Sequence, residues 1–130
     1  MSDSISAATD ETVFNVDTML KYMGNDANAL AVVTRIVRDA IAPGGGQLEL
    51  AGAAVREGRI ADACRVFHVM RGTIGSLGAK RFVRTALALE VALREGRGEQ
   101  FETLLAAVTV EYQLMLEQAT AWLQHRGASA

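Results

Sequence analysis

The chain has 130 residues, of which 50% are apolar and 22% are charged, and its formal net charge is −2. These values are typical of one globular domain with a single core, and the charge offers no basic footprint for nucleic acid or an anionic membrane. No apolar run reaches the roughly 18 residues of a membrane span, and the N-terminus lacks the pattern of a signal peptide. The single cysteine, Cys64, cannot form an intrachain disulfide. We therefore expect a soluble cytoplasmic protein.

The first third of the chain predicts a tail and two helices. Residues 1–12 are rich in Ser, Ala, Thr and Asp, and we expect a flexible N-terminal tail there. A short helix follows, capped by Asn15 or Asp17. Apolar residues then recur at helical spacing over 27–42. The run Pro43-Gly44-Gly45-Gly46 predicts a break or kink, because proline lacks the amide donor that a helix interior needs. The helical pattern resumes at Leu48.

The remaining two thirds predict three more helices, over residues 60–77, 80–95 and about 100–125, with glycine at each turn. Gly127 is expected to end the last helix, within a C-terminal tail of residues 126–130. No segment has the pattern of a strand. Short loops between amphipathic helices favour antiparallel neighbours. The prediction is an all-α, up-down four-helix bundle over residues 13–125, with an additional short N-terminal helix.

His68 is placed on the flank of the helix predicted over 60–77. A wheel at about 100° per residue sets it roughly 120° from the centre of the apolar seam, toward solvent. Ala61, Gly72 and Gly75 share this flank. A glycine in a helix interior costs about 0.5–1 kcal/mol relative to alanine, so two glycines here suggest that something approaches the histidine closely. The alternative is that the glycines permit close helix packing, in which case they would face another helix. We expect both glycines to face solvent.

The chemistry of this flank favours phosphoryl transfer. A neutral imidazole is a nucleophile that can accept a phosphoryl group. The guanidinium of Arg71 disfavours the imidazolium form and can bond phosphoryl oxygens. No GxxxxGK loop is present and the domain is too small for a nucleotide site, so the group must come from another protein. We assign His68 as phosphoacceptor and Arg71 as phosphoryl-stabilising. The residues expected to contact a partner are Ala61, Arg65, Gly72, Gly75, Lys80 and Arg84.

The stretch His68-Val69-Met70-Arg71-Gly72-Thr73, followed by Leu77-Gly78-Ala79, resembles the pattern H-x-[LM]-[KR]-G-[ST]-x-x-x-L-G-A of histidine-phosphotransfer (HPt) domains. The resemblance extends loosely to Glu90 and implies a four-helix bundle. It further implies a phosphorelay intermediate, in which His68 accepts a phosphoryl group from the aspartate of one receiver domain and passes it to another. Arg71 stands where the family usually has lysine, and Gly72 matches the glycine that leaves room for the receiver.

The same resemblance sets the expected partners, which are receiver domains of response regulators or a hybrid sensor kinase. The protein would be a phosphocarrier without an ATP site of its own and not an enzyme. Magnesium in such transfers belongs to the receiver, so we assign no cofactor and no metal to this chain. Cys64 and His68 lie at i, i+4 and could hold a metal, but two ligands make a weak site.

Two other functions fit parts of the pattern. One is an HPt-like binding module that docks on a receiver or sensor kinase to regulate it without transfer. The other is the dimerisation domain of a sensor kinase, in which an acidic residue usually follows the histidine and a proline comes soon after. Here Val69 follows, and Pro43 is the single proline. We therefore expect a monomer. Two interpretations remain open for Lys80, Arg81 and Arg84. They form either a basic rim for an acidic receiver pocket or an ordinary solvated face.

Overall fold

The computed structural model describes residues 12–129, so the predicted N-terminal tail lies outside the described residues except for Thr12. In chain order the helices are α2 (Asp17–Tyr22), α3 (Ala27–Ile41), α4 (Gly44–Arg56), α5 (Ile60–Gly75), α6 (Lys80–Arg94), the short 3-10 helix η1 (Gly98–Gln100) and α7 (Phe101–Ser129). No strand occurs among these residues, which confirms the all-α prediction. None of the described helices is long and apolar enough to cross a membrane.

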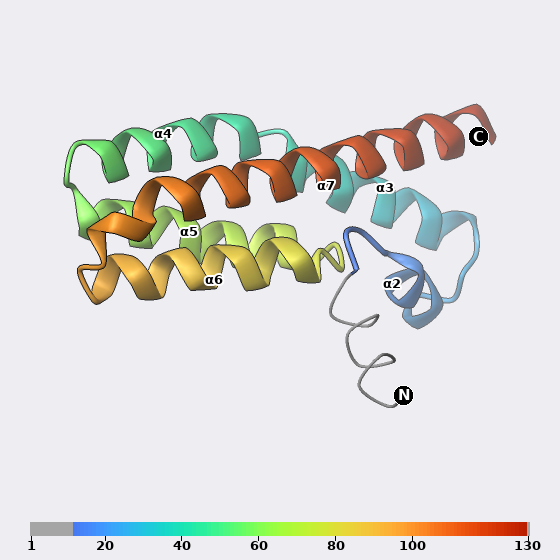
Figure 1. The fold of residues 1–130 in the computed structure, drawn as a ribbon. Helices are drawn as coiled ribbons and strands as arrows, with labels where there is room; N and C mark the ends of the chain where they lie inside the picture. The colour runs from blue at the N-terminus through green and yellow to red at the C-terminus, as the bar shows by residue number, and fades with distance from the viewer. Residues whose placement is uncertain (1–11, 130) are drawn as a thin grey trace, which may run out of the picture.

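Helices α4, α5, α6 and α7 form the bundle, with each helix antiparallel to the one before it (Figure 1). Each packs on its neighbour in the chain, and α7 closes the ring against α4. The side chains that point inward from these helices are almost completely buried, and most of them are large and apolar. They form one hydrophobic core, which is the main source of stability in a domain of this size. The largest are Phe67, Met70, Ile74, Phe82, Leu89, Tyr112 and Met115. The predicted four-helix bundle is therefore confirmed.

The predicted break at Pro43 is also confirmed, since α3 ends at Ile41 and α4 begins at Gly44. Beyond it α3 leaves the line of α4 and packs with α2 beside the C-terminal half of α7 (Figure 1). The three glycines, however, do not extend the break. They form the first turn of α4, where Gly44 is buried. A Cβ atom on Gly44 would lie 2.8 Å from Cε1 of Tyr112, so glycine allows the aromatic ring to pack against this turn.

The segment before α2 is tied to the turn between α5 and α6. The amide of Asn15 donates to the carbonyl of Leu77 at 2.9 Å, and the amide of Arg81 donates to the carbonyl of Thr12 at 3.0 Å. Gly78 makes this crossing possible, because its φ is +73° and a Cβ atom there would lie 3.0 Å from the nitrogen of Asn15. The crossing holds α2 near the C-terminal end of α5.

The predicted end of the last helix is wrong. Helix α7 continues to Ser129, past Gly127, so the segment predicted as a C-terminal tail is helical up to that residue. A single glycine lowers helix propensity by only about 1 kcal/mol, which the preceding turns of a long helix can absorb. The helix predicted over residues 60–77 ends two residues earlier than predicted, at Gly75. Leu77 is nevertheless fully buried.

Candidate functional site

His68 lies on the exposed flank of α5, as its helical position predicts. Phe67 and Met70, on either side of it in sequence, have no accessible surface. The backbone of the histidine is therefore held by a helix whose other face is fixed in the core, while the imidazole remains accessible. Cys64 and Arg71 are half-buried between the histidine and the core.

Arg71 contacts the imidazole directly. Its Nη2 lies 3.0 Å from Nδ1 of His68. A guanidinium carries only N–H donors, so Nδ1 must be the acceptor in this contact. The neutral ring then carries its proton on Nε2, and Nε2 is the ring nitrogen that points away from the arginine.

Arg71 is itself held by a buried carboxylate on α6. Its Nε donates to Oε2 of Glu90, and its Nη2 donates to Oε1 of Glu90 at 3.2 Å. The Glu90 side chain is only 1% exposed. Arg94 approaches the same carboxylate, with Nη1 3.8 Å from Oε1. We call Arg71 and Glu90 the arginine clamp. The hydrogen bonds that Arg71 donates to Glu90 raise the pKa of the Arg71 guanidinium above its usual value, so this group stays charged.

The role of Glu90 was not predicted from the sequence, although a signal for it exists. The inward face of α6 includes Ala86, Leu89 and Leu93. Glu90 comes four residues after the first and three before the last, so helical periodicity places it on that face. A carboxylate at such a position needs a cation partner, because burying an unpaired charge is costly. A half-buried arginine on the neighbouring helix is the partner to expect.

The prediction for the two glycines is half right. Gly72 is exposed, and a Cβ atom there would meet nothing within 4 Å. Gly75 is only partly exposed, and its Cβ atom would lie 2.9 Å from Cγ2 of Val83 on α6. The prediction that Gly75 faces solvent is therefore wrong. This glycine allows α5 and α6 to pack closely, whereas Gly72 leaves an open surface one turn beyond His68.

The three cations for which a basic rim and an ordinary solvated face were both left open do not share one surface. Lys80 and Arg84 are exposed and line a shallow hollow of about 480 Å³ with Gly75, Val83 and Leu87, between α5 and α6. Arg81 does not join them. Its Nη2 donates to Oε2 of Glu111 on α7 at 2.9 Å, on the other side of α6. Arg81 points elsewhere than Lys80 because neighbouring residues on a helix differ by about 100° in direction.

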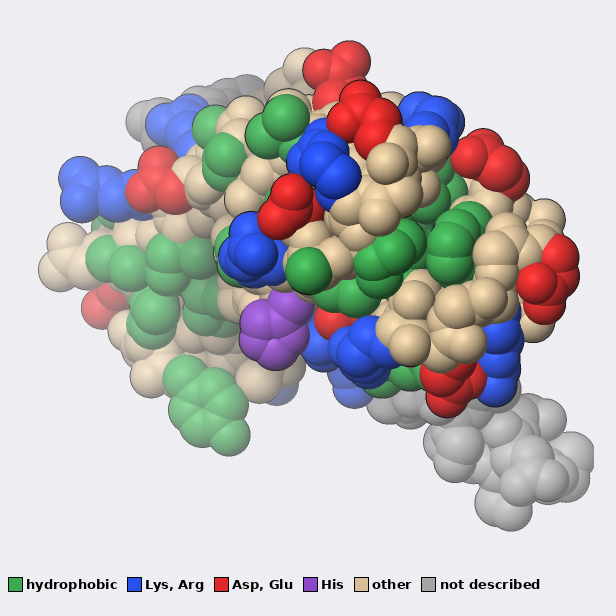
Figure 2. Space-filling model, turned by 90° about the vertical axis from the view of Figure 1, so that its left-hand side faces the viewer, with side chains coloured by type: hydrophobic (Ala, Val, Ile, Leu, Met, Phe, Trp, Pro, Cys, Tyr) green, Lys and Arg blue, Asp and Glu red, His purple; other side chains and the backbone are tan. Residues whose placement is uncertain are grey.

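Ala61 and Arg65 are exposed on the N-terminal half of α5. Arg65 donates to Oδ1 of Asp62 at 3.2 Å, and Arg59 donates to Oδ2 at 3.1 Å. These hydrogen bonds, first that from Arg59 and then that from Arg65, hold the pKa of the Asp62 carboxyl below its usual value. Such exposed pairs add little stability. Figure 2 shows acidic and basic side chains interspersed at this end of the bundle, where the α4–α5 and α6–α7 connections lie.

Cys64 is directed at α6. Its thiol donates to the carbonyl of Glu90 with a sulfur–oxygen distance of 3.9 Å, and burial raises the pKa of the Cys64 thiol. The thiol therefore belongs to the contact between α5 and α6. Within residues 12–129 no group of three or more His, Cys, Asp and Glu side chains is arranged to hold a metal ion.

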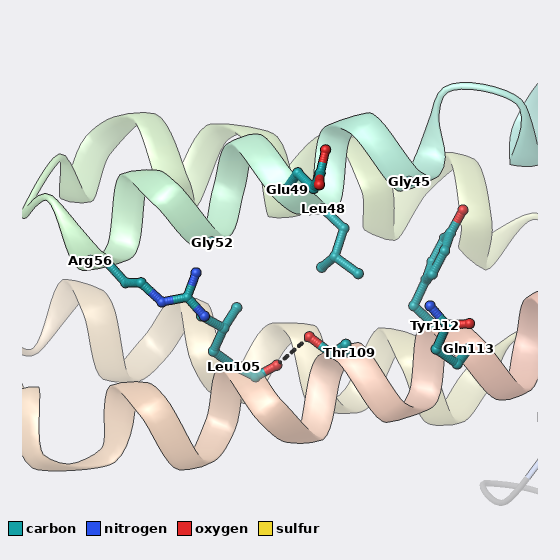
Figure 3. A pocket seen from close by; sticks show the side chains of 9 residues that line it. All are labelled: Gly45, Leu48, Glu49, Gly52, Arg56, Leu105, Thr109, Tyr112 and Gln113. Carbon is teal, nitrogen blue, oxygen red and sulfur yellow. Dashed lines mark hydrogen bonds between the residues drawn. The ribbon is translucent and has the colours of Figure 1, made fainter.

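A larger groove lies away from His68, between α4 and α7 (Figure 3). It has a volume of about 640 Å³ and is lined by Gly45, Leu48, Glu49, Gly52, Arg56, Leu105, Thr109, Tyr112 and Gln113. In the ring of four helices this face is opposite the contact of α5 with α6. Since the groove contains neither His68 nor the arginine clamp, it is not the candidate site.

Comparison with known proteins also indicates a histidine-phosphotransfer domain. No curated protein and no solved structure matches the chain significantly. The family model of the Hpt domain, however, matches residues 35–122. The matched segment covers most of the chain and includes α4, α5 and α6 entirely. The accessible histidine on a four-helix bundle and this match agree, and the chain belongs to the Hpt domain family, the histidine-phosphotransfer module of two-component signalling.

Proposed function

We propose that this protein is a phosphorelay intermediate, in which His68 receives a phosphoryl group from the aspartate of one receiver domain and delivers it to the aspartate of another. The observation that carries the proposal is the exposed imidazole on a rigid helix, with a fixed cation on one side and the open backbone of Gly72 on the other. Membership of the Hpt domain family supports the same class of reaction.

The proposed transfer uses Nε2 of His68, the nitrogen directed away from Arg71. The proton on Nε2 first passes to solvent, and Nδ1 takes a proton from solvent once Arg71 no longer donates to it. The Nε2 electron pair attacks the phosphorus of an aspartyl phosphate, and the N–P bond forms as the P–O bond to the aspartate breaks. The aspartate carboxylate leaves with the electron pair, and the second transfer reverses these steps. We assign Arg71, the cation that contacts this ring, to bond the phosphoryl oxygens. Magnesium belongs to the receiver, and we assign none to this chain.

The docking surface that we propose is the exposed flank of α5 around His68, together with the neighbouring exposed residues of α6. It combines the open Gly72 with two apolar side chains, Val69 and Leu87, which are 47% and 41% exposed. Lys80 and Arg84 border it at the far side. An apolar centre with basic residues at its edge suits an acidic pocket such as the one that surrounds a receiver aspartate. Ala61 and Arg65 would meet the partner on the other side of His68. We expect the protein itself to be a monomer.

The experiment is phosphotransfer from a panel of phosphorylated receiver domains from the same source. We expect labelling that is labile in acid and stable in base, and that is lost in His68→Gln. His125→Gln is the matched control, because His125 is the other of the chain's two histidines and lies at the far end of α7. It should be labelled like the wild type. If no receiver labels the wild-type protein while receivers still bind it, the protein is a non-transferring binding module and the proposal is wrong.

A further inference from the structure

One buried titratable group has no part in the transfer proposed above. Glu90 is the one charged residue in the buried core of residues 12–129, and its carboxylate faces two arginines. A carboxylate in this position costs desolvation energy that hydrogen bonds must offset. An apolar residue would fill the space on α6 without that cost. The carboxylate therefore needs a reason beyond packing, and its contact with Arg71 gives one.

The clamp fixes where Arg71 can direct its donors. The planar guanidinium is held at Nε by one carboxylate oxygen and at Nη2 by the other. The same Nη2 reaches Nδ1 of His68 at 3.0 Å. Because the three nitrogens of a guanidinium are coplanar, two anchored nitrogens define the direction of every remaining N–H bond. Glu90 thus sets the position of the donor beside the imidazole, although it does not touch the imidazole itself.

We propose that Glu90 is a positioning residue which, through Arg71, keeps Nδ1 of His68 unprotonated and so prolongs the lifetime of the phosphorylated imidazole. The inference rests on the phosphoacceptor role proposed for His68. A ring phosphorylated on Nε2 can carry a proton only on Nδ1. The N–H of Arg71 already occupies the Nδ1 electron pair, and the guanidinium charge opposes the arrival of a second cation.

Protonation of Nδ1 controls how easily the N–P bond breaks. In hydrolysis, a water oxygen bonds to phosphorus while the N–P electron pair returns to Nε2. If Nδ1 carries a proton, a neutral imidazole leaves. If Nδ1 is unprotonated, the leaving group is an imidazolate anion, which is much poorer. The clamp therefore disfavours the state in which the phosphoryl group is lost to water. When a receiver docks, its acidic pocket supplies other acceptors for Arg71, and Nδ1 can then be protonated for transfer.

The charged groups around Nδ1 act in different ways. The cations of Arg71 and Arg94 oppose its protonation, whereas the charge of the Glu90 carboxylate favours it, so Glu90 acts against protonation only by holding Arg71 in place. Arg71 contacts the ring from α5. Its partner Glu90 lies on α6, where Arg94 approaches the same carboxylate. The thiol of Cys64 faces the main chain of α6 and not the ring. If Glu90 loses its charge, Arg71 is released from its fixed position. The ring then loses its fixed donor.

The test compares the hydrolysis of phosphorylated wild-type protein with that of Glu90→Gln, over a range of pH and in a His125→Gln background. Phosphoramidate serves as the phosphoryl donor, so that no receiver is needed. We expect hydrolysis of Glu90→Gln at neutral pH to be roughly tenfold faster, the effect of about one hydrogen bond to a charged group. The acceleration toward acid should also begin at higher pH. An unchanged rate and pH profile would overturn the proposal.

Glu111→Gln is the matched control. It removes another poorly exposed carboxylate that pairs with an arginine across two helices, Arg81 on α6 with Glu111 on α7. It should lower stability in a similar way and leave the hydrolysis profile unchanged. If Glu90→Gln does not fold, Arg71→Lys gives the same test, because lysine lacks the two coplanar nitrogens by which Arg71 is anchored on the carboxylate while it donates to Nδ1. A wild-type profile for folded Arg71→Lys would then count against the clamp.

A second measurement needs no phosphorylation. Nitrogen NMR of the unphosphorylated protein distinguishes the two neutral forms of the ring. We expect Nδ1 of His68 to be the unprotonated nitrogen in the wild type, and the Nδ1–H form to increase in Glu90→Gln. A wild-type ring with its proton on Nδ1 would overturn the inference about the clamp. A failure of all receivers to label the protein would instead overturn the relay, with the NMR result unaffected.

Discussion

Gly72 allows stability and transfer to be separated. It lies in the interior of α5, between the buried residues Met70 and Ile74, and a Cβ atom there would meet nothing within 4 Å. Gly72→Ala should therefore gain the full difference in helix propensity, about 0.5–1 kcal/mol in the free energy of unfolding. For a domain of this size the gain corresponds to a rise in Tm of about 2–5 °C. Thermal unfolding followed by circular dichroism measures it.

A larger side chain at the same position should slow phosphoryl transfer. Gly72 follows His68 by four residues, so the two lie on one side of α5 about 6 Å apart along its axis. Gly72→Gln places a side chain where we expect the receiver surface to approach. We expect transfer from a phosphorylated receiver to slow roughly tenfold or more, because the loss of even one well-packed contact costs about 1–2 kcal/mol. Labelling by phosphoramidate should be unchanged, since a small donor needs no docking surface.

Gly46→Gln is the control for the Gly72 variants. Gly46 is an exposed helical glycine on α4, and its Cβ atom would also meet nothing within 4 Å. The substitution should raise stability and leave transfer unchanged. If Gly72→Gln accepts phosphoryl groups from receivers at the wild-type rate, the receiver does not approach over this part of α5. If Gly72→Ala lowers Tm, Gly72 is not the open position that the geometry indicates.

Three further predictions concern the packing of the bundle. Gly44→Ala should lower the free energy of unfolding by about 1–3 kcal/mol in a urea titration, because its Cβ atom would lie 2.8 Å from Cε1 of Tyr112; an unchanged midpoint would mean that the ring can move aside without cost. Gly78→Ala should cost at least about 1–2 kcal/mol, because φ is +73° and the added Cβ atom would lie 3.0 Å from the nitrogen of Asn15; Tm is the measurement, and no decrease would contradict this account of the crossing. Burial raises the pKa of Tyr112, so this tyrosine ionises in the unfolded chain at lower pH than in the folded protein. The free energy of unfolding should therefore fall as the pH rises above about 10, and it should fall less in Tyr112→Phe. An equal dependence on pH in the two proteins would refute the role given to Tyr112.

The features of this fold that depend on one helix at a time could be predicted from the sequence. Helical periodicity placed His68 on an exposed flank and Phe67 in the core, and the missing amide donor of Pro43 placed the break between α3 and α4. Each of these features follows from the direction of a side chain on a single helix or from the chemistry of a single residue. Neighbouring helices do not change them.

The features that were not predicted depend on the distance and rotation between two helices. Gly75 packs against Val83 and Arg81 turns toward Glu111, and neither contact is encoded in the pattern of α5 or α6 alone. Glu90 is the intermediate case. Its inward position follows from the periodicity of α6, but its pairing with Arg71 depends on how α5 and α6 face each other. Sequence patterns thus identify the buried charge, and the packing of helices identifies its partner.

The pairing with Glu90 also accounts for an arginine at position 71, where the family pattern accepts lysine or arginine. Two carboxylate oxygens and Nδ1 of His68 surround one side chain. A planar guanidinium can donate to all three acceptors at once from fixed directions, whereas the single nitrogen of a lysine would have to share its bonds among them in a geometry that tetrahedral N–H bonds do not match. A lysine at this position would remain a cation beside the phosphoryl group, but it would leave Nδ1 without a fixed donor. The identity of residue 71 and the buried carboxylate on α6 are therefore one feature of the site, and substitutions at either position should change the same property of His68.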